Sequence, residues 1–522
     1  MAAICGCNTN SGGPPVTYTI GGSVINLAGT GGGLVLEDNQ KDSVSVNANG
    51  MFVFPTAIAD GSAYSVTITT QPSNPAQTCG VTNGSGTASG NVTNIQVNCA
   101  HNEWTWAAGT NAVSNMAIYG TLGVGAMTNV PGGRHGAATW TDSSGSFWMF
   151  GGDGHDSTGN FSELNDLWKF SGGQWTWMGG PEVGNQAGAY GSLGIPNSAN
   201  VPGARYDAAV WSDGSGNVWL FGGNGYDSTG TWGYLNDFWK YSGGEWTWIG
   251  GSDLAGQQAS YGTKGVTAAS NVPGSRAGAA AWRDSGGNLW LFGGFELTVG
   301  ELNDLWEYSN GEWTWVSGSN VGGQNGVYGT QGIGSATNVP GARYWATAWT
   351  DSSGNFWLFG GAGYGATDGE GWLSDLWKYS NGQWIWISGP SAIMRGGVYG
   401  TEGVAAVGDN PGARQESTGW TDSSGNLWLF GGNGLDSTVN PGLLNDLWKY
   451  DHGGWTWMAG SNLVNQSAIY GTKGLPFPGN APGARTGEFG WIDQQGNLWL
   501  FSGYGVVSGS EGYLNDLWMY TP

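Results

Sequence analysis

Charged side chains, and basic ones above all, are scarce in this chain. Asp, Glu, Lys and Arg make up 10% of its 522 residues, and 15 basic residues stand against 38 acidic ones, which gives a net charge of −23. Nucleic acids and anionic membrane surfaces attract basic patches. We therefore exclude nucleic acid as a partner.

Long apolar segments are absent as well. No run of 18 apolar residues occurs, so no membrane-spanning segment is expected. The first residues, MAAICGCN, lack the charged and apolar regions of a complete signal peptide. Ile4 to Cys7, followed by a polar segment, nevertheless resembles the end of a bacterial lipoprotein signal with Cys7 as the lipidated residue. We interpret residues 1–14 as such a tether or as a plain N-terminal tail, and a truncated gene start is the third option.

Cysteine and histidine are too few for metal chemistry. None of the four cysteines lies beyond Cys99, and no two of the four histidines stand at metal-ligand spacing. We therefore predict no metal and no cofactor. Cys79 and Cys99 lie 20 residues apart. In a chain with few cysteines and the composition of a secreted protein, we predict that they form a disulfide.

Two familiar catalytic motifs are also missing. The chain has neither the phosphate-binding G-x-x-x-x-G-K loop nor the G-x-S-x-G nucleophile elbow. We assign no catalytic residue on this basis, and a non-catalytic protein is favoured over an enzyme.

What the chain has in abundance is repetition. Four short segments, such as TGWT, NLWLFGG, LNDLWKY and GGWTW of the fifth copy, recur between residue 103 and the end. Aromatic-rich segments bounded by Gly, Asn, Asp and Ser are typical of strands, and the turns DSSGN and SNGQ suit tight antiparallel hairpins. Each copy begins at an arginine, at intervals of 71, 71, 67, 71 and 71 residues: Arg134, Arg205, Arg276, Arg343, Arg414 and Arg485.

Four strands in each of six copies predict an all-β fold, a six-bladed β-propeller over residues 101–522. The first WTW segment, Trp104 to Trp106, has no repeat strands before it, and the last copy ends without a fourth strand. We expect this N-terminal strand to complete the last blade and close the ring. Thirty of the 33 tryptophans occupy five fixed positions per copy and are expected to form the core.

The repeat also resembles a known family. The glycine pair after the second strand, the Asn-Asp-aromatic-Tyr run of the third and the tryptophan of the fourth resemble kelch repeats, as in the superfamily of the galactose oxidase central domain. This resemblance implies a kelch-type propeller, but kelch units serve enzymes, actin binders and adaptors alike. A copper site of the galactose oxidase type is rejected, because no cysteine follows Cys99 and no histidines stand at ligand spacing.

The segment before the repeats has a different composition. Residues 15–100 contain no Trp and many Val, Thr and Ser, with alternating runs such as SVSV and YSVTITT. They predict a small antiparallel β-sandwich module, similar to the immunoglobulin-like or prealbumin-like modules at the front of bacterial surface proteins. Together with the low lysine content, this indicates an extracellular or bacterial cell-surface location.

Each copy contains one aspartate, in its third segment, that can pair with the arginine at its start. Because the pair is identical in all copies, it suits a structural ion pair that fastens the first strand to the third. The alternative is a ring of anion-binding arginines at one mouth of the propeller. The aspartates are Asp166, Asp237, Asp304, Asp375, Asp446 and Asp516.

The connections between the second and third strands vary most from copy to copy, so we expect recognition on the face that they share. We place Trp232 and Trp372 in these connections and Trp345 on an inner strand. Aromatic rings near acidic groups suit sugar stacking with hydrogen bonds. Carboxylates near the axis could instead act as an acid/base pair or merely line a solvated channel. The candidate ligand-binding residues are Trp345, Tyr344, Trp372, Trp232, Tyr206, Asp207, Glu416 and Glu488.

Three classes of function remain open. The first is a non-catalytic recognition or adhesion protein whose propeller face binds a glycan or a protein. The second is a structural subunit of a surface fibre or layer that assembles through the N-terminal β module. The third is a kelch-type carbohydrate-active enzyme, such as a glycosidase or a sialic-acid epimerase-like protein.

Overall fold

The computed structural model describes residues 16–27, 33–72, 77–100, 102–367, 369–477 and 479–522. Cys7, the predicted lipidation site, lies outside the described residues. The chain divides into two compact units, one of residues 1–106, 471–480 and 520–522 and the other of residues 107–470 and 481–519. Over the described residues the secondary structure is β throughout, which confirms the all-β prediction, and no helix is long and apolar enough to cross a membrane.

Two four-stranded sheets make up most of the first unit. One has the order β5 (Gly50–Val53), β2 (Ile20–Ile25), β10 (Val92–Ala100), β8 (Thr78–Thr82), and the other β4 (Asp42–Val46), β3 (Leu34–Asp38), β7 (Ala63–Thr70), β9 (Ser85–Thr87). A short pair, β1 (Thr17–Tyr18) and β6 (Ile58–Ala59), completes the set. Both sheets contribute to one core, with Val24 and Val97 from the first and Leu36 and Val66 from the second fully or almost fully buried.

The prediction of a purely antiparallel module is wrong at one pair of strands. β2 and β10 run parallel, with Val24 opposite Val97. A parallel pair needs a crossover rather than a hairpin between its strands. The chain provides one, since β3, β4 and β7 of the other sheet lie between β2 and β10 in the sequence.

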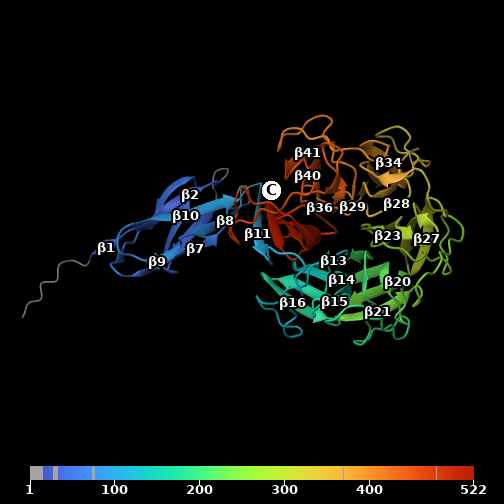
Figure 1. The fold of residues 1–522 in the computed structure, drawn as a ribbon, viewed down its shortest axis with the longest axis horizontal. Helices are drawn as coiled ribbons and strands as arrows, with labels where there is room; N and C mark the ends of the chain where they lie inside the picture. Colours follow the sequence, from blue (N-terminus) through green and yellow to red (C-terminus); the bar gives the residue numbers. More distant parts are fainter. Residues whose placement is uncertain (1–15, 28–32, 73–76, 101, 368, 478) are drawn as a thin grey trace, which may run out of the picture. The chain divides into compact units, whose positions relative to one another are not determined.

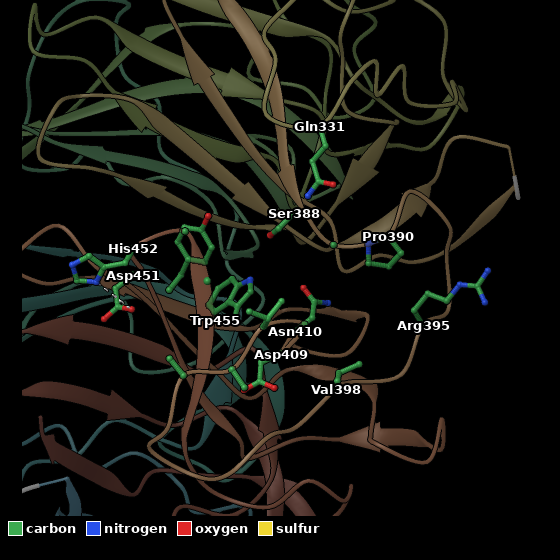
Figure 2. A pocket seen from close by; sticks show the side chains of 18 of the residues that line it. Gln331, Ser388, Pro390, Arg395, Val398, Asp409, Asn410, Asp451, His452 and Trp455 are labelled. Carbon is green, nitrogen blue, oxygen red and sulfur yellow. Dashed lines mark ion pairs between the residues drawn. The ribbon is translucent and has the colours of Figure 1, made fainter.

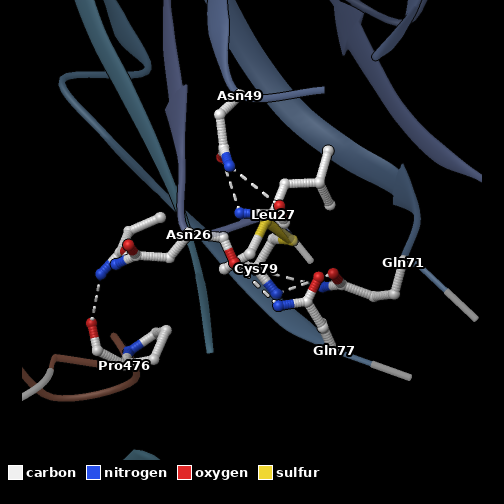
Figure 3. Close-up of a disulfide and its surroundings, with 9 residues drawn as sticks. Asn26, Leu27, Asn49, Gln71, Gln77, Cys79 and Pro476 are labelled. Atoms are coloured by element: carbon white, nitrogen blue, oxygen red, sulfur yellow. Dashed lines mark hydrogen bonds between the residues drawn. A yellow bond between two sulfur atoms is a disulfide. The ribbon is translucent and has the colours of Figure 1, made fainter. Parts of the chain in front are cut away.

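Cys79 and Cys99 are joined by a disulfide between β8 and β10, where the two residues stand opposite each other (Figure 3). Both sulfur-bearing side chains are buried in the core of the unit. Gln71 holds the same strand, because its side-chain amide donates to the Cys79 carbonyl at 3.0 Å and accepts from the Cys79 N–H at 2.8 Å.

Each sequence repeat forms one main sheet in the second unit, and in five of these six sheets the strands follow chain order from the first to the fourth. Hairpin turns such as Asp351 to Asn355 form as the sequence predicts, because the Asp351 carboxylate accepts the N–H groups of Ser353 and Asn355 at 2.9 Å. The first strands are β13 (Ala138–Thr141), β18 (Ala209–Ser212), β22 (Ala280–Arg283), β29 (Thr347–Thr350), β36 (Thr418–Thr421) and β43 (Phe489–Ile492). The second strands are β14 (Phe147–His155), β19 (Val218–Tyr226), β23 (Leu289–Phe292), β30 (Phe356–Phe359), β37 (Leu427–Phe430) and β44 (Leu498–Phe501).

The third and fourth strands complete these sheets. The third strands are β15 (Phe161–Ser171), β20 (Trp232–Ser242), β26 (Leu305–Ser309), β33 (Leu376–Ser380), β40 (Leu447–Asp451) and β47 (Leu517–Thr521). The fourth strands are β16 (Gln174–Gly179), β21 (Glu245–Gly250), β27 (Glu312–Ser317), β34 (Gln383–Ser388), β41 (Gly454–Ala459) and, in the sheet of β43, β44 and β47, the N-terminal strand β11 (Glu103–Ala108).

Beyond the glycine pair, short strands extend the main sheets of the first two repeats and form a separate small sheet in each of the other four. They are β12 (Arg134–His135), β17 (Arg205–Tyr206), β24 (Phe295–Glu296), β25 (Gly300–Glu301), β28 (Arg343–Tyr344), β31 (Ala362–Tyr364), β32 (Glu370–Trp372), β35 (Arg414–Gln415), β38 (Asn433–Leu435), β39 (Pro441–Leu443), β42 (Arg485–Thr486), β45 (Tyr504–Val507) and β46 (Ser510–Tyr513).

The hydrophobic core lies between neighbouring sheets rather than at one centre. In one cluster, Ala138 and Trp140 of the first repeat pack with Val218, Leu220 and Trp239 of the second. Large aromatic side chains fill the wedge between two twisted sheets, and each buries about 150 to 250 Å². The repeated tryptophans are therefore mainly structural.

The repeats follow one another around the second unit (Figure 1). Their first strands contact one another in a closed order, in which β13 lies next to β43. One residue per repeat, two positions after the arginine, links each sheet to the next through its main chain. Six N–H groups donate to the carbonyl of the preceding repeat, at 2.7 to 3.3 Å, and the last bond, from Gly136 to Gly487, completes the circle. We call these residues the axial ring: Gly136, Asp207, Gly278, Trp345, Glu416 and Gly487.

Each arginine that begins a repeat is buried against its aspartate. The closest nitrogen to oxygen distances lie between 2.6 and 2.8 Å in all six pairs. In the fourth repeat, Asp375 also accepts from the Tyr328 hydroxyl at 2.6 Å and from Trp377 Nε1 at 2.7 Å, and Arg343 donates to two main-chain carbonyls. The arginines are fully engaged inside the sheets, which supports the structural interpretation of these pairs over an anion-binding ring.

Candidate functional site

Beside the axial ring, each sheet presents a row of three residues on adjacent strands. In the second repeat, Tyr206 stands opposite Asn224, and Asn224 stands opposite Tyr234. The same register holds in the other five repeats, but the residue types differ. The remaining rows are His135, Asp153, Glu163; Ala277, Phe295, Glu301; Tyr344, Ala362, Trp372; Gln415, Asn433, Leu443; and Thr486, Tyr504, Tyr513.

The axial ring has an unusual backbone. All six of its residues have positive φ, between 51° and 67°, although Asp207, Trp345 and Glu416 are not glycine. A bulky residue in this region is strained, and such strain persists where the surrounding structure imposes it. The glycines make room for their neighbours, because a Cβ on Gly278 would lie 2.7 Å from Trp345 Cδ1.

Three carboxyl groups and one indole gather in a cavity of about 310 Å³ at this ring. Trp345 Nε1 donates to Asp207 Oδ2 at 2.7 Å, which fixes the indole across Gly278. Glu416 Oε2 accepts from the Thr486 hydroxyl at 2.8 Å. Glu488 is 6% exposed and lines the same cavity, and its Oε2 has no hydrogen-bond partner. A buried oxygen without a partner is costly and points to a missing donor.

Two of these carboxyls have pKa values that burial shifts up to the neutral range. Burial raises the pKa of Asp207 to about 7, and the neighbouring Glu416 adds to this rise. Burial raises the pKa of Glu488 to about 8, although Arg485 opposes the change. A protonated carboxyl can donate a hydrogen bond or a proton, as in known acid/base sites.

A smaller cavity of about 160 Å³ adjoins the first and shares Asp207 and Trp345 with it. Five aromatic rings line it, and we call this set the aromatic cage: Tyr206, Tyr234, Phe295, Tyr344 and Trp345. Neighbouring rings lie 4.4 to 5.7 Å apart along the series Tyr234, Phe295, Tyr344, Trp345. Asn224 also lines this cavity: it is 4% exposed, its side-chain nitrogen donates to the Tyr206 hydroxyl, and its Oδ1 has no partner.

Trp232 and Trp372 do not lie in loops as predicted. They are in strands β20 and β32, because the second and third strands of their repeats continue beyond the glycine pair as paired ribbons. Their indole nitrogens donate to Glu163 Oε1 at 2.9 Å and to Gln415 Oε1 at 3.0 Å respectively. Neither residue is among those that line the two cavities.

A larger cavity of about 900 Å³ lies between the fourth and fifth repeats, away from the axial ring. Figure 2 shows Asp409, Asn410 and Trp455 around this hollow. In the other repeats an asparagine fills the position of Asp409 and donates to two main-chain carbonyls, as Asn338 does to Ile333 and Trp384. Asp409 Oδ2 is buried without a partner, and burial raises its pKa. We call the segment between the fourth strand of one repeat and the arginine of the next a covering segment. The cavity thus coincides with the loss of these two hydrogen bonds in the covering segment between β34 and β35.

The sequence analysis named Tyr206, Tyr344, Trp345, Asp207, Glu416 and Glu488, and the structure brings these six together around the two cavities. It did not name Asn224, Tyr234 or Phe295. The signal was present, because these residues differ between repeats at positions where the neighbouring residues are nearly constant. Comparing the copies position by position would have found them.

No protein-family model matches this chain, and no curated protein matches it. The solved structures that match this chain include the following two. The structure of YjhT is 12% identical, with 75% of this chain and 96% of that chain covered and a TM-score of 0.44. A fungal alcohol oxidase of the AA5 family, in complex with copper, is 11% identical, with 74% of this chain and 62% of that chain covered and a TM-score of 0.39.

Proposed function

We propose that residues 101–522 form a six-bladed, kelch-type β-propeller closed by its N-terminal strand, and that its axial cavity binds a saccharide and performs acid/base chemistry on it. The observation that carries this proposal is the convergence of Asp207, Glu416 and Glu488 with Trp345 in one cavity. The circle of six main-chain hydrogen bonds supports the closed propeller.

The cavity matches a sugar in its hydrogen bonding. A saccharide hydroxyl can both donate and accept a hydrogen bond, so it can donate to the buried Asn224 Oδ1 and accept from Glu488 Oε2 when that carboxyl is protonated. Its C–H face can stack on an aromatic ring, and Trp345 is held in place by Asp207. Sialic acids fit less well, because no Lys or Arg lines either cavity to balance their carboxylate.

The chemistry needs a proton donor and a proton acceptor that differ in pKa. Glu488, with a pKa raised to about 8, would carry a proton at neutral pH and give it to a ring or glycosidic oxygen. A second carboxylate, for which Glu416 is the candidate, would take a proton from a hydroxyl group or a water molecule. One proton is given and one is taken, so no oxidant or metal is required.

A panel of neutral sugars tests this proposal. Aryl glycosides report hydrolysis, and exchange of sugar anomers is followed by NMR. We expect Glu488→Gln and Glu416→Gln to lower the turnover number at least 100-fold, because general acid/base catalysis contributes about 10² to 10⁴. The exposed Glu182→Gln is the matched control and should keep full activity. Turnover in both cavity variants equal to that of the parent would refute the acid/base role.

Non-catalytic recognition of a glycan is the second candidate, and the strained Trp345 beside Tyr344 favours it. Binding of a sugar without turnover, lost in Trp345→Ala and kept in Glu488→Gln, would establish it. The disulfide in the first unit supports our proposal that the protein is extracellular, since such bonds persist in oxidising compartments.

A further inference from the structure

The aromatic cage lies in a strongly acidic part of the molecule. Burial raises the pKa of Tyr206, and the charges of Asp207, Asp153 and Glu163 raise it further. Tyr344, across the cage, has a pKa raised to about 12 by burial and by nearby carboxylates, which are Glu301, Glu370 and Glu416. Six acidic side chains thus surround these rings.

The nearest basic side chain is His135, whose ring lies 5.9 Å from that of Tyr206 and outside the lining of both cavities. No Lys or Arg lines either of them, and the arginine that precedes Tyr206 is sealed against Asp237 at 2.6 Å. Among the described residues, no three His, Cys, Asp or Glu side chains are grouped as metal ligands would be. An organic cation would therefore complement the negative charge around the aromatic cage.

The lining of the cage matches an ammonium group in both of its properties. The faces of Trp, Tyr and Phe attract a cation through the ring quadrupole, which is negative on the face of the ring, and a cage of several rings is a known way to bind methylated ammonium groups. Asn224 Oδ1 is a buried acceptor that an N–H donor would satisfy. The volume, about 160 Å³, suits one small alkylammonium group.

We infer that the aromatic cage is a specificity site for an ammonium group, which Tyr206, Tyr234, Phe295, Tyr344 and Trp345 surround and Asp207 and Asn224 contact. Because the cage shares Asp207 and Trp345 with the axial cavity, an amino sugar can occupy both cavities at once. This part rests on the proposed function. A free alkylamine carries the same chemistry and would fill the cage alone.

Calorimetric titration of the full chain with four probes distinguishes an amino sugar from a free alkylamine as the ligand of the cage. Three are β-1,4-linked trisaccharides that differ in one group, namely the glucosamine trimer, its N-acetylated form and the glucose trimer, and the fourth is n-butylammonium. We expect the glucosamine trimer to bind at least tenfold more tightly than the other two trimers, with butylammonium competing for the site.

Substitutions in the cage separate the cation effect from simple packing. Phe295→Leu keeps an apolar side chain but removes the π face, and we expect it to reduce the preference for glucosamine about fivefold. Phe295→Tyr keeps the ring and should keep the preference. Tyr234→Leu is a second variant in case Phe295→Leu does not fold, and thermal unfolding of each variant checks this.

Each result assigns the site differently. Equal affinity for all three trimers would overturn the inference and leave saccharide binding intact. Binding of butylammonium but of none of the trimers would support the cage and overturn the saccharide proposal. Failure of butylammonium and all the trimers to bind, with turnover of neutral sugars still present, would overturn the inference alone.

Discussion

At the scale of single residues, the axial cavity combines groups that folding alone does not favour. Glu488 is buried with an oxygen that has no partner, and Trp345 and Asp207 have positive φ. Each of these features costs free energy of about 1 to 3 kcal/mol. Natural sequences tolerate such costs mainly at functional sites, so their convergence in one cavity is the strongest sign of function in this chain.

Glu488 should make stability depend on pH. Its ordinary pKa of 4.5 rises to about 8 in the folded protein, so between these values the folded state binds more protons than the unfolded state. This contribution to stability is fully present below pH 4.5 and is lost as the pH rises through about 8. Glu488→Gln removes it, and the decline in stability between pH 5 and 8 should become shallower by up to about 1.4 kcal/mol per pH unit.

Urea unfolding of the parent and the variant at pH 5, 6.5 and 8 measures this difference. Glu182→Gln, an exposed carboxylate, should leave the parent curve unchanged. Parallel declines of the parent and Glu488→Gln would show that Glu488 does not hold its proton in the folded state.

The site residues themselves divide into those that the sequence reveals and those that it hides. Trp345 and Glu416 stand out because they replace glycine two positions after the arginine, where three of the six copies have glycine. Asn224 and Phe295 follow a glycine pair and resemble loop residues when one copy is read alone, although a comparison of the copies shows that their position varies. Their place in the cage depends on the strand pairs that extend past that glycine pair, which the composition of the loops does not show.

At the scale of structural elements, the covering segments illustrate what one amide contributes. The side-chain amides of Asn271 and Asn338 each donate two hydrogen bonds. One goes to a carbonyl of the same covering segment and the other to a carbonyl of a fourth strand. Asp409 cannot donate in this way when it is ionised, and its Oδ2 has no partner.

Asp409→Asn should restore these hydrogen bonds in the segment between β34 and β35. We expect the free energy of unfolding to rise by about 1 to 2 kcal/mol, because two hydrogen bonds replace one buried unpaired carboxylate oxygen. The reciprocal change, Asn338→Asp, should lower it by about 1 to 3 kcal/mol. Urea unfolding of both variants at pH 7 measures the two effects, and a stability loss in Asp409→Asn would indicate that the carboxylate is engaged by another group.

At the scale of the whole molecule, repetition makes the architecture accessible from the sequence. The strands, their hairpins and the pairing of β11 with β47 follow from the aromatic pattern and from the incomplete first and last copies. The parallel pair β2 and β10 in the first unit could not be foreseen, because strand direction depends on how the chain passes between two sheets, and neither composition nor periodicity records that path.

The main-chain circle of the axial ring has a consequence for how the second unit melts. A linear array of modules frays from its two terminal modules, whose outer sides lack a neighbour. A circle of linked sheets has no terminal module, since Gly136 binds Gly487 as every other member binds the one before it. We expect calorimetry to show a single heat-absorption peak for the repeats, and limited proteolysis to leave no ladder of fragments spaced by about 71 residues.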